Sequence, residues 1–182
     1  KCKNYISDIL VPLLCAILYI REVFFMKSNY EIQNVTWDQI EKLSSKILNQ
    51  INDLDEKIDT LVPVFRGGTP LAMLLAANME NVSTACIHIK RSKENIPNSE
   101  FGIPTHKGTT NSKVITGKNI LLVEDIIDNG ETIELAIKEA EKLKPNRIYI
   151  ATLFNFNKGK YSNVITGEKM ESHCWIVFPW ER

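Results

Sequence analysis

The segment Asn119–Val123 (NILLV) is apolar without interruption and leads directly into two carboxylates, Glu124 and Asp125. A strand without a polar face must be covered on both sides, as the central strands of parallel sheets are. A helical pattern begins at residue 133, and a turn at 128–130 separates it from the strand. This order of strand, turn and helix predicts an α/β fold with residues 119–123 at the centre of the sheet.

The remaining secondary-structure patterns agree with this architecture. Thr36 and Gln39 have the spacing of a capping box at the start of one helix, and Thr69 is expected to cap another. Residues 92–118 are polar and contain two prolines, so they predict a long loop of the kind that often has a function. Strand patterns occur at 61–65, 84–90, 147–154 and 174–178, and apolar residues recur at helical spacing over 37–54. The helix expected at 70–79 is apolar almost all round, which predicts that it is buried.

Composition excludes several classes of protein. The chain has 182 residues, enough for one domain with a full core. Lys plus Arg and Asp plus Glu number 22 each, so the formal net charge is zero and the basic footprint of a dedicated nucleic-acid-binding protein is missing. None of the four cysteines belongs to a CxxC pair, so neither a zinc site nor a disulfide framework is predicted. We expect a cytoplasmic protein with reduced thiols and no nucleic-acid partner.

The first 25 residues differ in character from the rest. Residues 9–20 form an apolar run behind Lys1 and Lys3, which resembles the start of a signal peptide, but no small-residue cleavage site follows. The run is also shorter than the ~20 residues that span a bilayer. Three interpretations stay open: translated sequence upstream of a true start at Met26, a real N-terminal helix, or a membrane or export element. We favour the first, with residues 1–25 as an uncertain extension, a domain at 26–182 and no membrane association.

The turn after the central strand has the residues of a sugar-phosphate site. Backbone N–H groups at the start of a helix bind phosphate well, and Gly130 lets an anion approach the backbone. Thr132 adds a hydroxyl donor, while Glu124 and Asp125 suit hydrogen bonds from sugar hydroxyls or a hard cation such as Mg²⁺. Because open α/β sheets bind ligands beyond the carboxyl ends of their strands, the segment predicts a site for a ribose 5-phosphate with magnesium.

Two common ligand-binding loops are excluded for this segment. A calcium-binding loop would need Asp or Asn where Ile127 stands, and the P-loop motif is absent from the chain. A plain helix cap beside a solvated acidic turn is the alternative that the residues alone leave open.

The segment Ile120–Thr132 (ILLVEDIIDNGET) resembles the phosphoribosyl-pyrophosphate (PRPP) motif of type I phosphoribosyltransferases. That motif consists of an apolar strand, two acidic residues and an Asp-Thr-Gly-x-Thr turn, and Asn129 departs from it because the family usually has Thr there. Residues 63–72 (PVFRGGTPLA) are similar to the family's pyrophosphate loop, in which an Arg-Gly-Gly turn holds the leaving diphosphate. Without β-carbons, Gly67 and Gly68 let the backbone approach that anion closely.

Two segments near the ends of the chain narrow the resemblance. Residues 34–40 (NVTWDQI) and 172–182 (SHCWIVFPWER) are similar to the N-terminal signature and the purine-binding tail of the xanthine/guanine (6-oxopurine) enzymes. The four motifs occur in the family's order over residues 30–182. The resemblance therefore implies the type I phosphoribosyltransferase fold, with a mostly parallel central sheet flanked by helices, a flexible loop over the active site and a small C-terminal hood.

The resemblance also implies roles for individual residues. Asp128 would act as general base, or as hydrogen-bond acceptor, for the purine, and Glu124 and Asp125 would complete the catalytic set by holding the ribose hydroxyls. Mg²⁺ would be held by Glu124, Asp125 and Glu181, and the purine would be contacted by Trp175, Ile176, Phe156 and Lys158. PRPP would be bound by Arg66, Gly67, Gly68, Glu124, Asp125, Asp128, Asn129, Gly130, Glu131 and Thr132.

One departure concerns the base. The family places a lysine four residues after the Thr of its ATL-like strand, to recognise the purine 6-oxo group. Counted from Thr152, that position is Phe156, and the nearest lysine is Lys158. The resemblance implies a purine-salvage pentosyltransferase that acts on PRPP and on xanthine, guanine or hypoxanthine, assembled as a homo-oligomer, a dimer or tetramer. A PRPP-sensing regulator of the same fold and a transferase for a different base are the alternatives.

Overall fold

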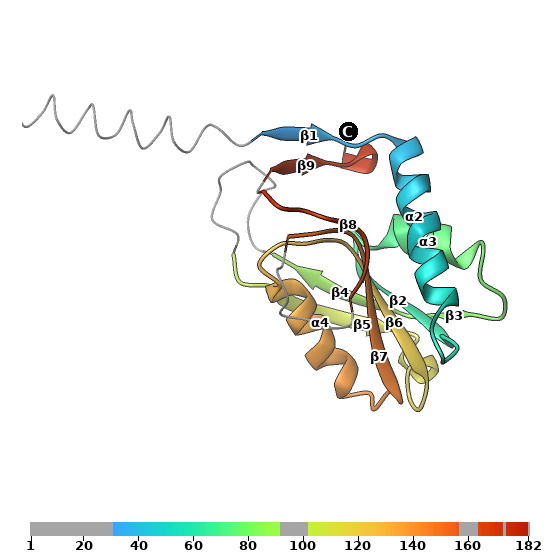
Figure 1. Cartoon of the computed structure of the whole chain (residues 1–182). Coiled ribbons are helices and arrows are strands. Elements are labelled where there is room, and N and C mark those ends of the chain that lie inside the picture. The colour runs from blue at the N-terminus through green and yellow to red at the C-terminus, as the bar shows by residue number, and fades with distance from the viewer. Residues whose placement is uncertain (1–30, 92–101, 157–163, 173, 182) are drawn as a thin grey trace, which may run out of the picture.

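The computed structural model describes residues 31–91, 102–156, 164–172 and 174–181 (Figure 1). Its helices are α2 (Trp37–Asn52), α3 (Thr69–Ala76) and α4 (Glu131–Glu141), with short 3₁₀ helices η1 (Ser112–Val114) and η2 (Pro179–Glu181). Its strands are β1 (Ile32–Asn34), β2 (Thr60–Phe65), β3 (Ser83–Thr84), β4 (Cys86–Lys90), β5 (Thr105–Thr110), β6 (Asn119–Ile127), β7 (Arg147–Asn155), β8 (Val164–Lys169) and β9 (Trp175–Val177).

β6 lies in the interior of the main sheet. The strand order is β5-β4-β2-β6-β7-β8, with β3 beside β2. The paired strands are parallel except for β4 and β5, which run antiparallel. The four side chains of 120–123 are completely buried, as expected for a strand that is covered on both faces. The predicted central strand and mostly parallel sheet are therefore confirmed.

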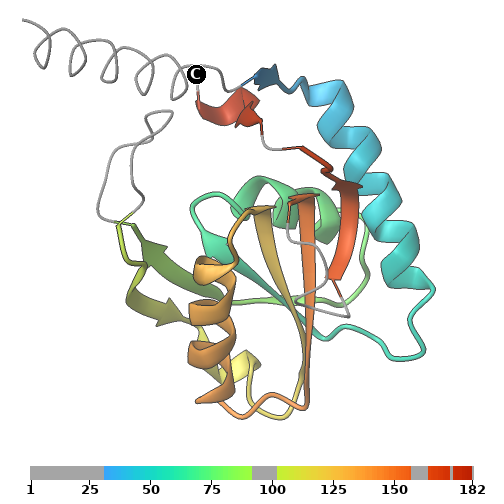
Figure 2. The ribbon, with the colours of Figure 1, turned by 60° about the vertical axis from the view of Figure 1, so that its left-hand side comes forward.

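Helices cover both faces of this sheet (Figures 1 and 2). Leu121 and Val123 belong to a core cluster with α2 and α3, whereas Ile120 and Leu122 belong to a second cluster with α4. This alternation follows from the two-residue period of a strand, which sends successive side chains to opposite faces. The apolar stripe of α2 is buried in the first cluster, and its other face carries polar residues.

The helix starts are close to those expected from the sequence. The predicted capping box of α2 is confirmed: the N–H of Gln39 donates to Oγ1 of Thr36 at 3.3 Å, and the N–H of Thr36 donates to Oε1 of Gln39 at 2.9 Å. In α3 the expected cap is wrong by one residue, because Gly68 occupies the cap position and Thr69 is already helical. The Thr69 hydroxyl is buried without a hydrogen-bond partner among the described residues.

Strand β1 and the two edge strands of the main sheet, β5 and β8, were not expected from the sequence. The predicted loop at 92–118 contains β5 and η1 in its described part, and β8 occupies a stretch that reads as polar. Each edge strand pairs with the strand before it in the chain, β5 antiparallel to β4 and β8 parallel to β7. Edge strands of this kind are held by backbone pairing and need few apolar side chains, so their local pattern is weak.

A small second sheet forms the predicted hood. β1 pairs in parallel with β9, and η2 follows β9. The ring of Trp180 stacks on Phe178 with ring centroids 4.6 Å apart, which anchors η2 to the main core. Figure 2 shows this hood beyond the carboxyl ends of β6 and β7.

Several predictions lie outside the described residues: the interpretation of residues 1–25, the part of the flexible loop at 92–101, and Lys158. They stay predictions. Across the described ranges, no helix combines the length and the apolar character that crossing a membrane requires.

Candidate functional site

The Arg66-Gly67-Gly68 turn and the acidic pair meet at one edge of the sheet. β2 and β6 are neighbouring parallel strands with Pro63 opposite Val123, so the turn that follows β2 lies beside the acids at the end of β6. A β-carbon added to Gly67 would lie 2.6 Å from Cγ of Asp125. In the structure, Gly67 lies close to the acidic pair, whereas its predicted approach to a diphosphate stays a prediction.

Gly68 packs even more tightly, against backbone. A β-carbon at this position would overlap the carbonyl oxygen of Val123 and lie 2.7 Å from its carbonyl carbon. The absence of a side chain therefore sets how closely the start of α3 approaches β6. Arg66 precedes this contact and is exposed, with its guanidinium accessible to a ligand.

Burial dominates the electrostatics of the acidic pair. The Glu124 side chain is only 6% exposed, and burial together with the charge of Asp125 raises its pKa well above the usual range, against the opposing effect of Arg91. Burial also raises the pKa of Asp125 to about 6; a hydrogen bond involving Glu124 lowers it and the charge of Glu181 raises it again. The backbone N–H of Asp125 donates to Oε1 of Glu124 at 3.2 Å. Such a pair favours a proton, a hydroxyl donor or a cation.

The carboxylates of Glu124 and Asp125 suit a magnesium ion whose other ligands are water and substrate phosphates. No group of three His, Cys, Asp or Glu side chains within the described ranges is arranged to hold a metal ion. Mg²⁺ usually needs fewer, since one or two carboxylates with water and substrate phosphates suffice. The carboxylate oxygens of Glu124 and Asp125 lie close together and repel each other when both are charged. A magnesium ion bound with a diphosphate would relieve that repulsion. Glu181 acts on Asp125 through its charge, while its Oε2 accepts the backbone N–H of Phe178 at 3.0 Å.

The turn at 128–130 joins this edge to the start of α4. Asp128 and Asn129 are exposed, and Gly130 has a φ of 87°, a left-handed conformation that favours glycine. Oδ1 of Asn129 accepts the backbone N–H of Glu131 at 3.1 Å, which closes the turn at the helix start. Although Asn129 departs from the family's Thr, its side chain still shapes the turn.

Sequence reasoning missed Arg91. This residue directly follows β4, and its Nε donates to Oγ1 of Thr132 at 2.9 Å. One terminal guanidinium nitrogen donates to Oδ1 of Asn129 at 3.2 Å and lies 3.1 Å from the carboxylate of Glu131. The available signal was its position, since a basic residue at the carboxyl end of a strand beside the central pair points to the same edge.

The described residues assigned to the purine, which leave out Lys158, lie in the hood and in the core beneath it. Trp175 is partly exposed on β9, and Ile176 beside it is buried. Phe156 is 8% exposed and belongs to the main core cluster, together with Ile176 and Phe178. The Phe156 ring is therefore packed in the core, as is usual for phenylalanine, and its contact with a base stays a prediction.

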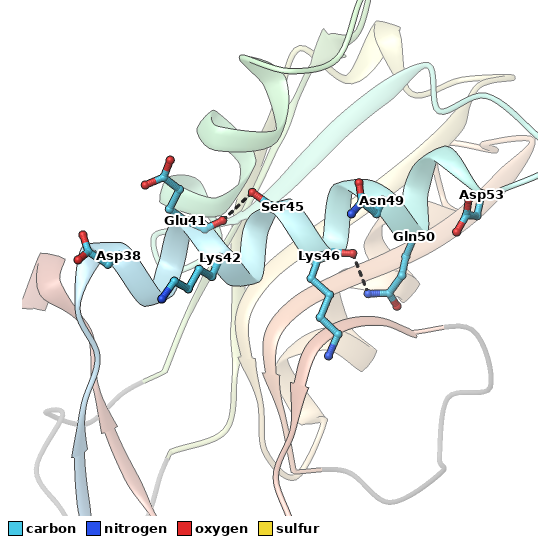
Figure 3. A pocket seen from close by; sticks show the side chains of 8 residues that line it. All are labelled: Asp38, Glu41, Lys42, Ser45, Lys46, Asn49, Gln50 and Asp53. Carbon is cyan, nitrogen blue, oxygen red and sulfur yellow. Dashed lines mark hydrogen bonds between the residues drawn. The ribbon is translucent and has the colours of Figure 1, made fainter.

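A separate hollow of about 740 Å³ runs along the outer face of α2 (Figure 3). Only polar and charged side chains line it, and they all come from this one helix and its cap: Asp38, Glu41, Lys42, Ser45, Lys46, Asn49, Gln50 and Asp53. None of them is a predicted site residue. The hollow is the solvated face of an amphipathic helix.

The raised pKa of Asp125 predicts a pH dependence of stability. Because the folded protein holds this proton more tightly than the unfolded chain, with an ordinary pKa of 3.8, the free energy of unfolding should fall as pH rises from about 4 through about 6. The difference amounts to at most roughly 3 kcal/mol. Urea unfolding of the magnesium-free protein between pH 4 and 7.5 measures it. The Asp125→Asn variant should lack this part of the slope, and a difference from the wild type that is constant with pH would contradict the assignment.

Comparison with known proteins agrees with this geometry. The family model for the phosphoribosyl transferase domain matches residues 28–181. A bifunctional protein PyrR from Trichormus variabilis is 30% identical over 118 residues, which cover 62% of this chain and 63% of that protein. The chain thus spans less than two thirds of that relative. A xanthine-guanine phosphoribosyltransferase from Ruegeria sp. is 26% identical over 155 residues, covering 81% of this chain and 84% of the relative.

Solved structures share the fold. A purine phosphoribosyltransferase from Pyrococcus horikoshii superposes with a TM-score of 0.67 at 24% identity, over 84% of this chain and 95% of that one. At this identity the likeness concerns the arrangement of helices and strands.

Proposed function

This chain belongs to the phosphoribosyl transferase domain family, and on that premise we propose that it is a PRPP-dependent pentosyltransferase that acts on a 6-oxopurine base. The reaction is displacement at C1′ of PRPP by a purine nitrogen, with release of pyrophosphate. Its products are a purine nucleoside monophosphate and pyrophosphate, which makes the protein a purine-salvage enzyme.

The contact between Gly67 and Asp125 is the observation that carries this proposal. It brings the turn proposed for the diphosphate next to the acids proposed for the ribose. In PRPP the diphosphate is bonded directly to the ribose, so adjacent sites are what the ligand requires. The buried Thr69 hydroxyl, which finds no partner in the described parts of the chain, adjoins the same turn. An unsatisfied buried hydroxyl costs free energy, and a diphosphate oxygen would relieve that cost.

The residues divide the work of the displacement. The transition state resembles an oxocarbenium ion, with positive charge on the ribose ring and negative charge growing on the leaving diphosphate. Arg66 stabilises the leaving group through its guanidinium charge, which is electrostatic catalysis by a group already in place. The N–H groups of Gly68 and Thr69 already donate to the carbonyl oxygens of Val64 and Arg66. Glu124 and Asp125 accept hydrogen bonds from the ribose hydroxyls and orient the ring. Mg²⁺, when bound with the diphosphate, supplies further charge neutralisation through Glu124 and Asp125.

Asp128 completes the proposed mechanism. It is exposed in the turn that leads into α4, three residues after Asp125. As a carboxylate it accepts the proton that the purine imidazole ring loses when the new bond forms. Trp175 of the hood offers a flat aromatic face for the purine.

An assay with a panel of bases tests the function. With PRPP and Mg²⁺, we expect pyrophosphate release that depends on xanthine, guanine or hypoxanthine, and none with uracil or adenine. Chelation of the metal should abolish turnover. Binding of PRPP without turnover on any base would favour a PRPP-sensing regulator, turnover with uracil alone would favour a transferase for another base, and absence of PRPP binding would refute the proposal.

A further inference from the structure

Arg91 lies at the end of β4 and contacts the turn proposed for the sugar phosphate. It follows β4, and α4 packs on β4 as well as on β6, so the Arg91 side chain reaches the start of α4 directly. Its guanidinium contacts Thr132, Asn129 and Glu131 at 2.9, 3.2 and 3.1 Å. The Arg91 side chain is 19% exposed, so the charge is largely withdrawn from water.

The contacts of Arg91 are those of a cation placed beside an anion site. A phosphate oxygen that accepts a hydrogen bond from the Thr132 hydroxyl would lie no more than about 6 Å from Nε of Arg91, because that hydroxyl is 2.9 Å from Nε. A guanidinium with its forked donors matches phosphate geometry well. In addition, the first turn of α4 offers backbone N–H groups and a positive helix end to the same anion.

We propose that Arg91 is a phosphate-binding residue of this site, which holds the Glu131 carboxylate in the free protein and exchanges it for the 5′-phosphate of the ligand. The inference rests on the proposed function, since it concerns the same ligand. Glu131 then serves as an internal stand-in for the phosphate: its side chain is 52% exposed and can turn toward solvent when the ligand arrives. Both exchange partners are anions, so the guanidinium stays paired throughout.

Binding measurements on the Arg91→Gln variant test the proposal. Calorimetric titration should use three probes: PRPP and ribose 5-phosphate, which carry the 5′-phosphate, and pyrophosphate, which does not. We expect affinity for the first two to fall by about 10- to 100-fold, the loss expected for charge-assisted hydrogen bonds. Pyrophosphate should bind within about twofold of wild type, because its site is the turn at Arg66. The matched control is Lys90→Gln, an equal charge change at the exposed residue one position earlier.

A second variant separates binding from a purely structural role. Glu131→Gln removes the competing carboxylate, so ribose 5-phosphate should bind about 2- to 5-fold more tightly, in the range of a charge effect at a helix end. If Arg91 only braced the turn through Glu131, the same variant would weaken binding. Arg91→Lys keeps the positive charge but loses the paired N–H donors of the guanidinium. Its affinity for ribose 5-phosphate should lie between those of the wild type and Arg91→Gln.

The outcomes distinguish the two claims. Unchanged binding of ribose 5-phosphate to Arg91→Gln, or an equal loss for pyrophosphate, would overturn the role of Arg91 while the proposed function stands. Failure of the wild-type protein to bind PRPP would overturn the proposed function and this inference with it.

Discussion

Replacing Asp128 with alanine is expected to lower kcat by about 10²- to 10⁴-fold while PRPP still binds with near wild-type affinity. The range is that of a positioned group for proton transfer. Binding should persist because Asp128 is exposed and the turn is shaped by other residues, with Asn129 closing it onto the N–H of Glu131 and Arg91 bound to Thr132. Steady-state kinetics with varied PRPP and base, combined with titration of PRPP alone, measure both quantities.

Two further variants sharpen this test. Asp128→Asn keeps a hydrogen-bond acceptor of the same shape but cannot take up the proton, so it should be nearly as slow as the alanine variant if Asp128 is the base. Recovery of most of the activity in Asp128→Asn would instead assign it the acceptor role. Asp55→Ala removes an exposed carboxylate ahead of β2, at the opposite edge of the sheet, and should leave kcat unchanged. Unchanged turnover in Asp128→Ala would remove this residue from the mechanism.

The part of the fold that could be predicted from the sequence is the part fixed by burial. The apolar run before Glu124 has no polar face, so its place inside a parallel sheet follows from solvent exclusion alone, and the side chains at 120–123 are indeed fully buried. The capping box of α2 is likewise a local arrangement of two side chains and two N–H groups. Both features can be read from a few consecutive residues, without knowing which other segments of the chain pack against them.

The features that were missed depend on tertiary pairing. β5 (THKGTT) carries no apolar alternation and exists because its backbone pairs with β4. Arg91 reads as one basic residue in a polar stretch, and only the packing of α4 on both β4 and β6 brings it to the turn that follows β6. The acidic pair and the glycine turns are visible as local sequence patterns. Arg91 is not, because its place beside the turn depends on how distant segments of the chain pack together.

The tight contacts of the glycine turn connect fold and function, and they predict the second large effect. Gly68→Ala would place a β-carbon on the Val123 carbonyl oxygen and 3.1 Å from Cα of Glu124, both backbone atoms that cannot rotate away. The start of α3 must therefore move off β6. We expect a loss of about 1–3 kcal/mol in the free energy of unfolding, or roughly 2–12 °C in Tm. We also expect a loss of about 10²-fold in kcat/KM, because the Arg66 turn is displaced from the acids.

Gly67→Ala and Gly117→Ala decide whether the Gly68 effect is specific to the site. At Gly67 the three atoms nearest to the added β-carbon all belong to the Asp125 carboxyl group, which can rotate away. Stability should then be largely kept, while affinity for PRPP with Mg²⁺ falls because Asp125 has turned. At Gly117 the surroundings are open but φ is 67°, so alanine should cost stability through backbone strain alone. If Gly117→Ala lowered kcat/KM as much as Gly68→Ala, general destabilisation would explain both. If Gly117→Ala keeps its kinetics at a comparable loss of stability, the spacing between the Arg66 turn and the acidic pair is what catalysis requires.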